Sequence, residues 1–197
     1  MDEAIKLLKK ANVLQEGHFL LTSGKHSGKY LQCSKIFQDT RLGEWFCKKL
    51  ADIYRNDNIE TVIGPAIGAI LISYETSRQL GVKNIFAERD ADGKMSLRRG
   101  FKIKKGERVL VVEDVVTTGG SVREVIDIVK NAGGVVAGVG SIVDRTGGKI
   151  DFGLPYKAVV SIEVDSYNAE ECPLCKMGIV IEKPGSKTEV SANGRGA

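Results

Sequence analysis

The sequence predicts an α/β fold, with a mostly parallel central sheet flanked by helices. From residue 61 onward, short apolar runs typical of strands alternate with amphipathic stretches typical of helices. The run 109–112 is apolar throughout, as expected of a strand that is covered on both faces. Residues Val122, Val125, Ile126 and Val129 recur at the spacing of a helix with one buried face. Such alternation is typical of parallel sheets with helices on both sides.

The N-terminal part is expected to contain two amphipathic helices separated by short strands. Asp2 is expected to cap the first helix. Gly and Ser residues between the helices punctuate two β-like segments, 19–21 and 30–32. The apolar positions that define the helices are Ala4, Ile5, Leu7, Leu8 and Ala11 in the first, and Leu42, Trp45, Phe46, Leu50 and Ile53 in the second.

The remaining elements follow in strand–helix order. A short strand at 61–63 breaks at Gly64-Pro65, and a helix is expected over 68–80. The tail from about residue 184 is rich in Gly, Ser and Lys, and we expect it to be mobile. The other expected segments are a strand at 84–87, a polar loop at 89–94, and strands at 109–112, 135–143 and 158–164.

Length and composition predict one compact domain over residues 1–197, with 42% hydrophobic and 27% charged residues. The net charge of +4 is too mild to predict nucleic-acid binding. No apolar run approaches the roughly 18 residues that a membrane span requires, and the N-terminus lacks the features of a signal peptide. Four cysteines fit a reducing compartment, so we expect a cytoplasmic protein with no membrane partner.

The segment 109–121, VLVVEDVVTTGGS, carries the clearest functional signal. Two carboxylates, Glu113 and Asp114, follow a buried strand, and the carboxyl ends of parallel strands are where ligands bind. Alone, such a pair is more often simply solvated. The following residues offer successive N–H groups, hydroxyls and a helix N-terminus, an arrangement that binds phosphate. They are Thr117, Thr118, Gly119, Gly120 and Ser121.

Two other nucleotide motifs are excluded by this residue order. The chain contains no GxxxxGK[ST], so a P-loop NTPase is unsupported. It also contains no GxGxxG with an acidic residue downstream, because here the acids precede the glycines. The sequence therefore favours a ligand that carries a ribose and a phosphate side by side.

VLVVEDVVTTGGS closely resembles the phosphoribosyl-diphosphate (PRPP) motif of type I phosphoribosyltransferases. The resemblance implies that Glu113 and Asp114 hold the ribose hydroxyls and that 117–121 hold the 5′-phosphate. It further implies that family's fold, with a small hood formed by about residues 1–40 and a C-terminal segment. The residues expected to bind PRPP are Glu113, Asp114, Val115, Val116, Thr117, Thr118, Gly119, Gly120 and Ser121.

Other segments resemble the orotate phosphoribosyltransferases in particular. GHFLLTSGKHSGKYLQCSK resembles their N-terminal signature, and FAERDADGKMSLRRGF their mobile catalytic loop. SIVDRTGG places Arg145 where the family contacts orotate, and Thr117 and Lys25 are assigned to the same substrate. Arg89, Lys94 and Asp114 are the candidate catalytic residues. IGPAIGA resembles the pyrophosphate loop, formed here by Gly64, Pro65, Ala66, Ile67 and Gly68.

The resemblance implies transfer of ribose 5-phosphate from PRPP to orotate, giving orotidine 5′-monophosphate and pyrophosphate in pyrimidine (UMP) biosynthesis. It implies Mg²⁺ carried by PRPP with no firm protein ligand, and a homodimer that binds no nucleic acid. Two alternatives stay open: a phosphoribosyltransferase for a purine or another pyrimidine, and a PRPP-sensing regulator of the same fold. The pair Cys172 and Cys175 supplies at most half of a zinc site, which favours a structural role or completion across a dimer.

Overall fold

The computed structural model describes residues 3–21 and 23–184, which form two compact units. The larger unit comprises residues 3–13 and 33–164, and the smaller comprises 14–32 and 165–184. The small unit was expected to begin near residue 1, whereas residues 3–13 lie with the larger one. Asp2 and the tail beyond residue 184 lie outside the described residues. Within the described ranges, no helix has the length and apolarity to cross a bilayer.

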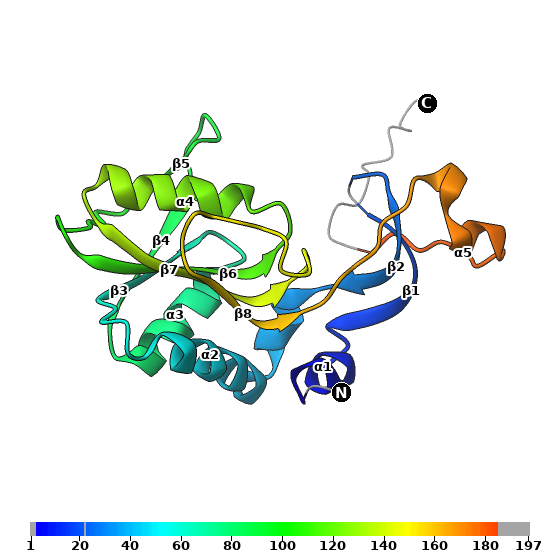
Figure 1. Ribbon diagram of the computed structural model, residues 1–197, viewed down its shortest axis with the longest axis horizontal. Coiled ribbons are helices and arrows are strands. Elements are labelled where there is room, and N and C mark those ends of the chain that lie inside the picture. Colours follow the sequence, from blue (N-terminus) through cyan, green and yellow to red (C-terminus); the bar gives the residue numbers. More distant parts are fainter. Residues whose placement is uncertain (1–2, 22, 185–197) are drawn as a thin grey trace, which may run out of the picture. The chain divides into compact units, whose positions relative to one another are not determined.

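The larger unit contains a six-stranded sheet in the order β5-β4-β3-β6-β7-β8 (Figure 1). Every pairing is parallel except that of β5 with β4 at the edge. This confirms the expected mostly parallel sheet. The strands are β3 (Thr61–Pro65), β4 (Lys83–Arg89), β5 (Met95–Ser96), β6 (Arg108–Val116), β7 (Val135–Asp144) and β8 (Tyr156–Ser161).

Helices cover both faces of this sheet. α2 (Thr40–Tyr54) and α3 (Ile70–Leu80) lie on one face, and α4 (Gly120–Asn131) lies on the other (Figure 1). The side chain of Asp39 caps α2 by accepting a hydrogen bond from the Arg41 N–H. The buried side of α4 consists of the four residues that the 3.6-residue period predicted. α1 (Glu3–Lys10) and a 3₁₀ helix, η1 (Cys33–Gln38), complete the larger unit.

The strand order determines where a ligand can bind. β3 leads through α3 to β4 on one side, and β6 leads through α4 to β7 on the other. The chain direction across the sheet therefore reverses between β3 and β6. In open α/β sheets, the crevice beyond the carboxyl ends of two such strands is the usual ligand site.

β6 is longer than its apolar run. The run 109–112 is buried, but pairing with β7 continues through Glu113 opposite Ser141 and Val116 opposite Asp144. The acids were expected to follow the strand. They lie within it instead. Their place in the ladder fixes their backbone more firmly than a loop would.

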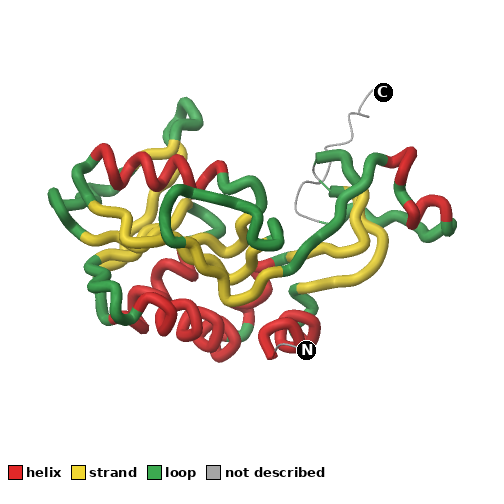
Figure 2. Tube along the Cα trace, in the orientation of Figure 1, coloured by secondary structure: helices red, strands yellow, loops and turns green. Residues whose placement is uncertain are grey.

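The smaller unit consists mainly of strand and loop (Figure 2). β1 (Leu14–Leu20) and β2 (His26–Leu31) form an antiparallel hairpin whose register shifts between Glu16 and Phe19. A 3₁₀ turn, η2 (Ala169–Glu171), and α5 (Pro173–Lys176) follow in the C-terminal part. Backbone bridges join Phe19 to Glu182 and His26 to Tyr167.

Glu107, just before β6, bonds to the first residues of β3 and β4 in the larger unit. Its carboxylate accepts a hydrogen bond of 2.6 Å from Thr61 Oγ1 and pairs with Lys83 Nζ at 2.5 Å. The N–H of Lys104 donates to its second oxygen at 2.6 Å. Burial raises the pKa of Glu107, but these donors outweigh burial and lower the pKa to about 2.

We predict that Glu107→Gln lowers the free energy of unfolding by about 2–3 kcal/mol at pH 7. A carboxyl whose pKa is depressed by folding stabilises the protein above its unfolded pKa, and that stabilisation is lost as the pH falls toward 2. Urea unfolding of both proteins between pH 7 and pH 2.5 measures the difference. A difference that stays constant over this range would contradict the assignment.

Candidate active site at the end of the central strand

Glu113 and Asp114 are adjacent, half-buried carboxyl groups near the end of β6. The N–H of Asp114 donates to Glu113 Oε1 at 3.1 Å, and the N–H of Val115 donates to Asp114 Oδ1 at 2.7 Å. Burial raises the pKa of Glu113, and the charge of Asp114 raises it further. Burial also raises the pKa of Asp114. Both groups would gain stability from a ligand that supplies positive charge or hydroxyl donors.

A small hollow of about 80 Å³ lies directly beyond the acids. It is lined by Glu113 and by the continuous stretch 115–122 that joins β6 to α4. Gly119 is the N-cap of α4 and makes no side-chain capping bond. The first N–H groups of a helix have no partner within the helix, so this end of α4 offers donors to an anion. The predicted phosphate-binding residues therefore do line one concave site.

The conformation of this turn requires glycine at position 119. Gly119 has a φ of 74°, which side chains disfavour. A Cβ atom there would lie 2.5 Å from Ile150 Cδ1 and 2.7 Å from Phe152 Cε1. Gly120 differs, because the nearest atom to a Cβ would be Thr118 Oγ1 at 3.9 Å. The two glycines of the motif therefore have different structural roles.

The loop 64–68 lies beside the acid pair. It begins within β3, and the N–H of Ala66 donates to the carbonyl of Ala87 on β4 at 2.6 Å. A Cβ atom on Gly68 would lie 3.4 Å from Asp114 Oδ2. Ile67 is 86% exposed at the tip of the loop. The loop and the acid pair are far apart in the sequence. The structure brings them together at the reversal point between β3 and β6.

Arg145 follows β7 and is held next to the end of β6. Its N–H donates to the carbonyl of Val116 at 2.9 Å. The thiol of Cys33 is buried, which raises its pKa, and the charges of Asp114, Arg145 and Glu113 also act on that thiol. The acids and Arg145 therefore lie near this buried thiol, which no sequence motif identifies.

Asp144 positions the Arg145 loop and was not identified from the sequence. Its carboxylate accepts hydrogen bonds from the N–H and hydroxyl of Thr146, both at 2.7 Å, and from the N–H of Gly148 at 2.7 Å. Ser161 on β8 adds a fourth bond. Burial raises the pKa of Asp144, but these donors outweigh it, so that the pKa is lowered. A buried carboxylate that fixes a loop in this way is a positioning residue.

Arg89 is the last residue of β4, and Lys94 lies in the tight hairpin turn that leads to β5. The N–H of Asp90 donates to the carbonyl of Lys94, and the Asp90 side chain accepts from the N–H of Lys94. Both nitrogens of the Arg89 fork donate to Glu124 on α4, at 2.9 and 3.0 Å. Neither Arg89 nor Lys94 lines the hollow beyond the acids. The expected polar loop is present. In this structure it is a turn held by hydrogen bonds between its own residues.

Lys25 belongs to the smaller unit. It lies exposed in the turn between β1 and β2, where its carbonyl accepts a hydrogen bond from the N–H of Leu21 at 2.8 Å. Lys25 thus lies outside the compact unit that carries the acid pair. The assignment of Lys25 to the base therefore stays a prediction from the sequence.

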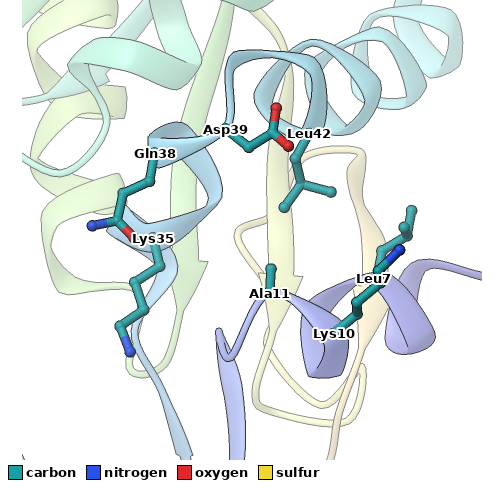
Figure 3. A pocket seen from close by; sticks show the side chains of 7 residues that line it. All are labelled: Leu7, Lys10, Ala11, Lys35, Gln38, Asp39 and Leu42. Atoms are coloured by element: carbon teal, nitrogen blue, oxygen red, sulfur yellow. The ribbon is translucent and has the colours of Figure 1, made fainter.

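A larger hollow of about 380 Å³ lies elsewhere on the larger unit (Figure 3). Side chains from the end of α1, from η1 and from the start of α2 surround it, and Figure 3 shows Lys10 and Lys35 on opposite sides. None of the candidate catalytic or substrate-binding residues lines it. Its lining residues are Leu7, Lys10, Ala11, Lys35, Gln38, Asp39 and Leu42.

Comparison with known proteins agrees with this geometry. A phosphoribosyl transferase domain matches residues 35–174. Orotate phosphoribosyltransferase from Caldanaerobacter subterraneus is 56% identical over 186 residues, covering 94% of this chain and 97% of the relative. The chain belongs to the orotate phosphoribosyltransferase family. The member of this family from Thermotoga maritima is 50% identical over 182 residues, covering 92% of this chain and 97% of that protein.

Solved structures of phosphoribosyltransferases share the fold. The crystal structure of orotate phosphoribosyltransferase from Aeropyrum pernix has a TM-score of 0.70 and 25% identity, and covers 88% of this chain and 97% of its own. Adenine phosphoribosyltransferase from Rhodothermus marinus has a TM-score of 0.65 at 18% identity, covering 81% of this chain and 98% of its own. The fold is thus common to transferases named for different bases, and the base must be argued from the site and the close relatives.

We predict that Gly119→Ala lowers the free energy of unfolding by about 2–4 kcal/mol, because the new methyl group combines an unfavourable φ with overpacking. Gly120→Ala is the matched control, since its Cβ points into open space at the start of α4. We expect the control to change stability by less than about 1 kcal/mol. Thermal unfolding of the two variants measures the contrast, and equal melting temperatures would contradict this account of the turn.

Proposed function

We propose that this protein transfers ribose 5-phosphate from PRPP to orotate, giving orotidine 5′-monophosphate and pyrophosphate for pyrimidine biosynthesis. One observation carries the proposal. The acid pair and the phosphate-binding turn lie together at the end of β6, in a chain that is 50–58% identical, over nearly its full length, to proteins named orotate phosphoribosyltransferase. The regulator alternative has no observation in its favour.

The end of β6 and the start of α4 would hold PRPP. Glu113 and Asp114 would accept hydrogen bonds from the vicinal ribose hydroxyls, which favours the charged carboxylates and offsets their raised pKa values. The N–H groups of 117–121 would bind the 5′-phosphate, aided by the N-terminal dipole of α4. Each charge-assisted hydrogen bond is worth about 1.5–3 kcal/mol, so several fix the donor firmly.

The reaction needs no covalent intermediate with the protein. The orotate nitrogen attacks C1′ of the ribose while pyrophosphate leaves, through a transition state with positive charge on the ribose. Asp114, which lies beside Gly68 in the 64–68 loop, would stabilise that charge. The loop's backbone would hold the departing pyrophosphate. Arg89 and Lys94 would reach pyrophosphate only after the hairpin turn rearranges, because Arg89 is paired with Glu124 here.

Arg145 would bind the orotate carboxylate, for which a planar guanidinium is the best match. Asp144 would keep the Arg145 loop in place through its four hydrogen bonds. Thr117 lies where the phosphate-binding turn begins, so its side chain is available to the base. Lys25 is assigned to orotate on the family resemblance alone.

Mg²⁺ is the cofactor that PRPP chemistry requires, and the residues present fit it. The carboxylate oxygens of Glu113 and Asp114 are hard donors of the kind that Mg²⁺ prefers, and it usually retains several waters. When bound with PRPP, the ion neutralises charge on the pyrophosphate group. The carboxylates would reach the ion through these waters, so we assign it to PRPP with no firm protein ligand.

We also propose that the protein acts as a homodimer in the cytoplasm. Three apolar side chains, Ile67, Leu71 and Tyr74, are more than half exposed at the start of α3 and in the loop before it. Such exposure at helical spacing favours contact with a second copy of the chain. Cys33 and Cys47 are buried and form no disulfide, as is usual for proteins of a reducing compartment. Sedimentation analysis of the purified chain measures the expected doubling of mass.

The decisive experiment for the function is loss of orotate absorbance in the presence of PRPP and Mg²⁺, with uracil, hypoxanthine and adenine tested in parallel. We predict turnover of orotate alone. We further predict that Arg145→Gln raises KM for orotate at least about tenfold and leaves KM for PRPP nearly unchanged. Arg55→Gln, which removes an exposed arginine paired with Asp52, is the control.

Turnover of a purine but not of orotate would overturn the proposal. An equal rise of both KM values in Arg145→Gln would instead remove Arg145 from base recognition.

A further inference from the structure

Four metal-binding side chains gather in the smaller unit. One donor atom from each of His18, His26, Cys172 and Cys175 lies within 4.8 Å of the others. His18 is on β1 and His26 opens β2, whereas the cysteines lie at the start of α5. His18 and Cys172 are 154 positions apart in the sequence. The second half of the zinc site that the CxxC motif lacked is therefore supplied by the same chain.

Of four donor separations, two fall in the range expected around a tetrahedral zinc ion and two are slightly shorter. Zn–N bonds of about 2.0–2.1 Å and Zn–S bonds of about 2.3 Å place tetrahedral donor atoms roughly 3.3–3.8 Å apart. The observed distances are 3.0 Å between His18 Nε2 and His26 Nδ1, 3.5 Å from Cys172 Sγ to His18 Nε2, and 3.2 Å from Cys175 Sγ to His26 Nδ1. Cys175 Sγ is also 3.8 Å from His18 Nε2.

The hydrogen bonding around His18 leaves the correct nitrogen for a metal. Its Nδ1 lies 2.7 Å from the carbonyl of Ile179, an acceptor, so Nδ1 carries the proton and Nε2 presents a lone pair. That lone pair faces His26 and both cysteines, although it can accept only one proton. A cation at the centre satisfies all four donors at once. A carbonyl behind a metal-binding histidine is also the usual support for such a ligand.

The backbone holds these ligands in place. The N–H of Glu182 donates to the carbonyl of His18 at 2.7 Å, and the N–H of His26 donates to that of Tyr167 at 2.8 Å. The turn after the cysteines is closed by the bond from the Gly178 N–H to the carbonyl of Cys175. The hairpin and the C-terminal segment are thus joined on both sides of the cluster.

The smaller unit has little else to stabilise it. Among its described residues, the buried apolar side chains are those of Leu14, Phe19, Leu31 and Cys172. A two-stranded sheet with so small a core is marginal in water. Structural metal ions commonly supply the missing stability in units of this size.

We propose that His18, His26, Cys172 and Cys175 bind a structural Zn²⁺ ion that fastens the C-terminal segment to the β1–β2 hairpin. The mixed nitrogen and sulfur donor set favours zinc over the oxygen-seeking Mg²⁺. Four protein ligands close the coordination shell, so this ion takes no part in the transfer reaction. Binding releases the two thiol protons as the cysteines become thiolates.

The test begins with the zinc content of the full chain, purified from cells supplied with Zn²⁺ and measured by plasma mass spectrometry. We expect about one Zn²⁺ per chain. Cys175→Ser should lose most of it, whereas Cys47→Ser, which removes a buried thiol from α2, should retain it. A strong chelator should lower the melting temperature of the wild type and of Cys47→Ser but not of Cys175→Ser.

A second measurement covers the case in which Cys175→Ser does not fold. Wild-type protein stripped of metal and titrated with Co²⁺ should develop the visible bands of tetrahedral cobalt together with thiolate-to-cobalt charge transfer, and added Zn²⁺ should abolish both. If metal-stripped protein that is then supplied with Zn²⁺ takes up far less than one Zn²⁺ per chain, the proposal is overturned. An octahedral cobalt spectrum, or equal zinc in Cys175→Ser and Cys47→Ser, would also overturn it.

Discussion

Two carboxyl groups on consecutive residues of a central strand impose a cost that a bound ligand can relieve. Glu113 and Asp114 are half-buried, and burial together with their like charge raises the pKa of Glu113. Neutral residues at these positions would make the folded protein more stable. A ligand that brings hydroxyl donors and a cation offsets the free-energy cost of burying the two acids. The loop 64–68, the turn at Gly119 and the Arg145 loop all lie around these acids.

The sequence predicted the sheet well, because its evidence is local. A continuous apolar run predicts a strand covered on both faces, and the 3.6-residue period of Val122 to Val129 predicts α4. The length of β6 was underestimated, because Glu113 and Asp114 interrupt its apolar run and the strand continues beyond them through pairing with β7. Pairing partners are distant in sequence, so no local pattern reports them. Asp144 was missed for a different reason: three of its four hydrogen bonds come from the nearby Thr146 and Gly148, and no sequence motif marks a loop that folds back onto a carboxylate in this way.

For the functional residues too, continuous stretches could be predicted from the sequence and discontinuous clusters could not. The phosphate-binding turn is a continuous stretch, and a sequence motif describes it fully. The proposed zinc cluster is discontinuous. The CxxC motif supplies two ligands, but His18 and His26 lie on different strands, and only the pairing of the hairpin brings them together. The roles of Arg89 and Lys94 are harder to predict, since they depend on a rearrangement of the hairpin turn between β4 and β5.

The proposed function depends above all on the acid pair on β6, which would bind the ribose of PRPP. Calorimetric titration of PRPP with Mg²⁺ near pH 8, in two buffers of different ionisation enthalpy, tests it most directly. Because ligand binding favours the charged carboxylates, the wild type should release more protons than the Glu113→Gln/Asp114→Asn double variant, which should also bind PRPP far more weakly. Equal affinity and equal proton release in the two proteins would contradict the account.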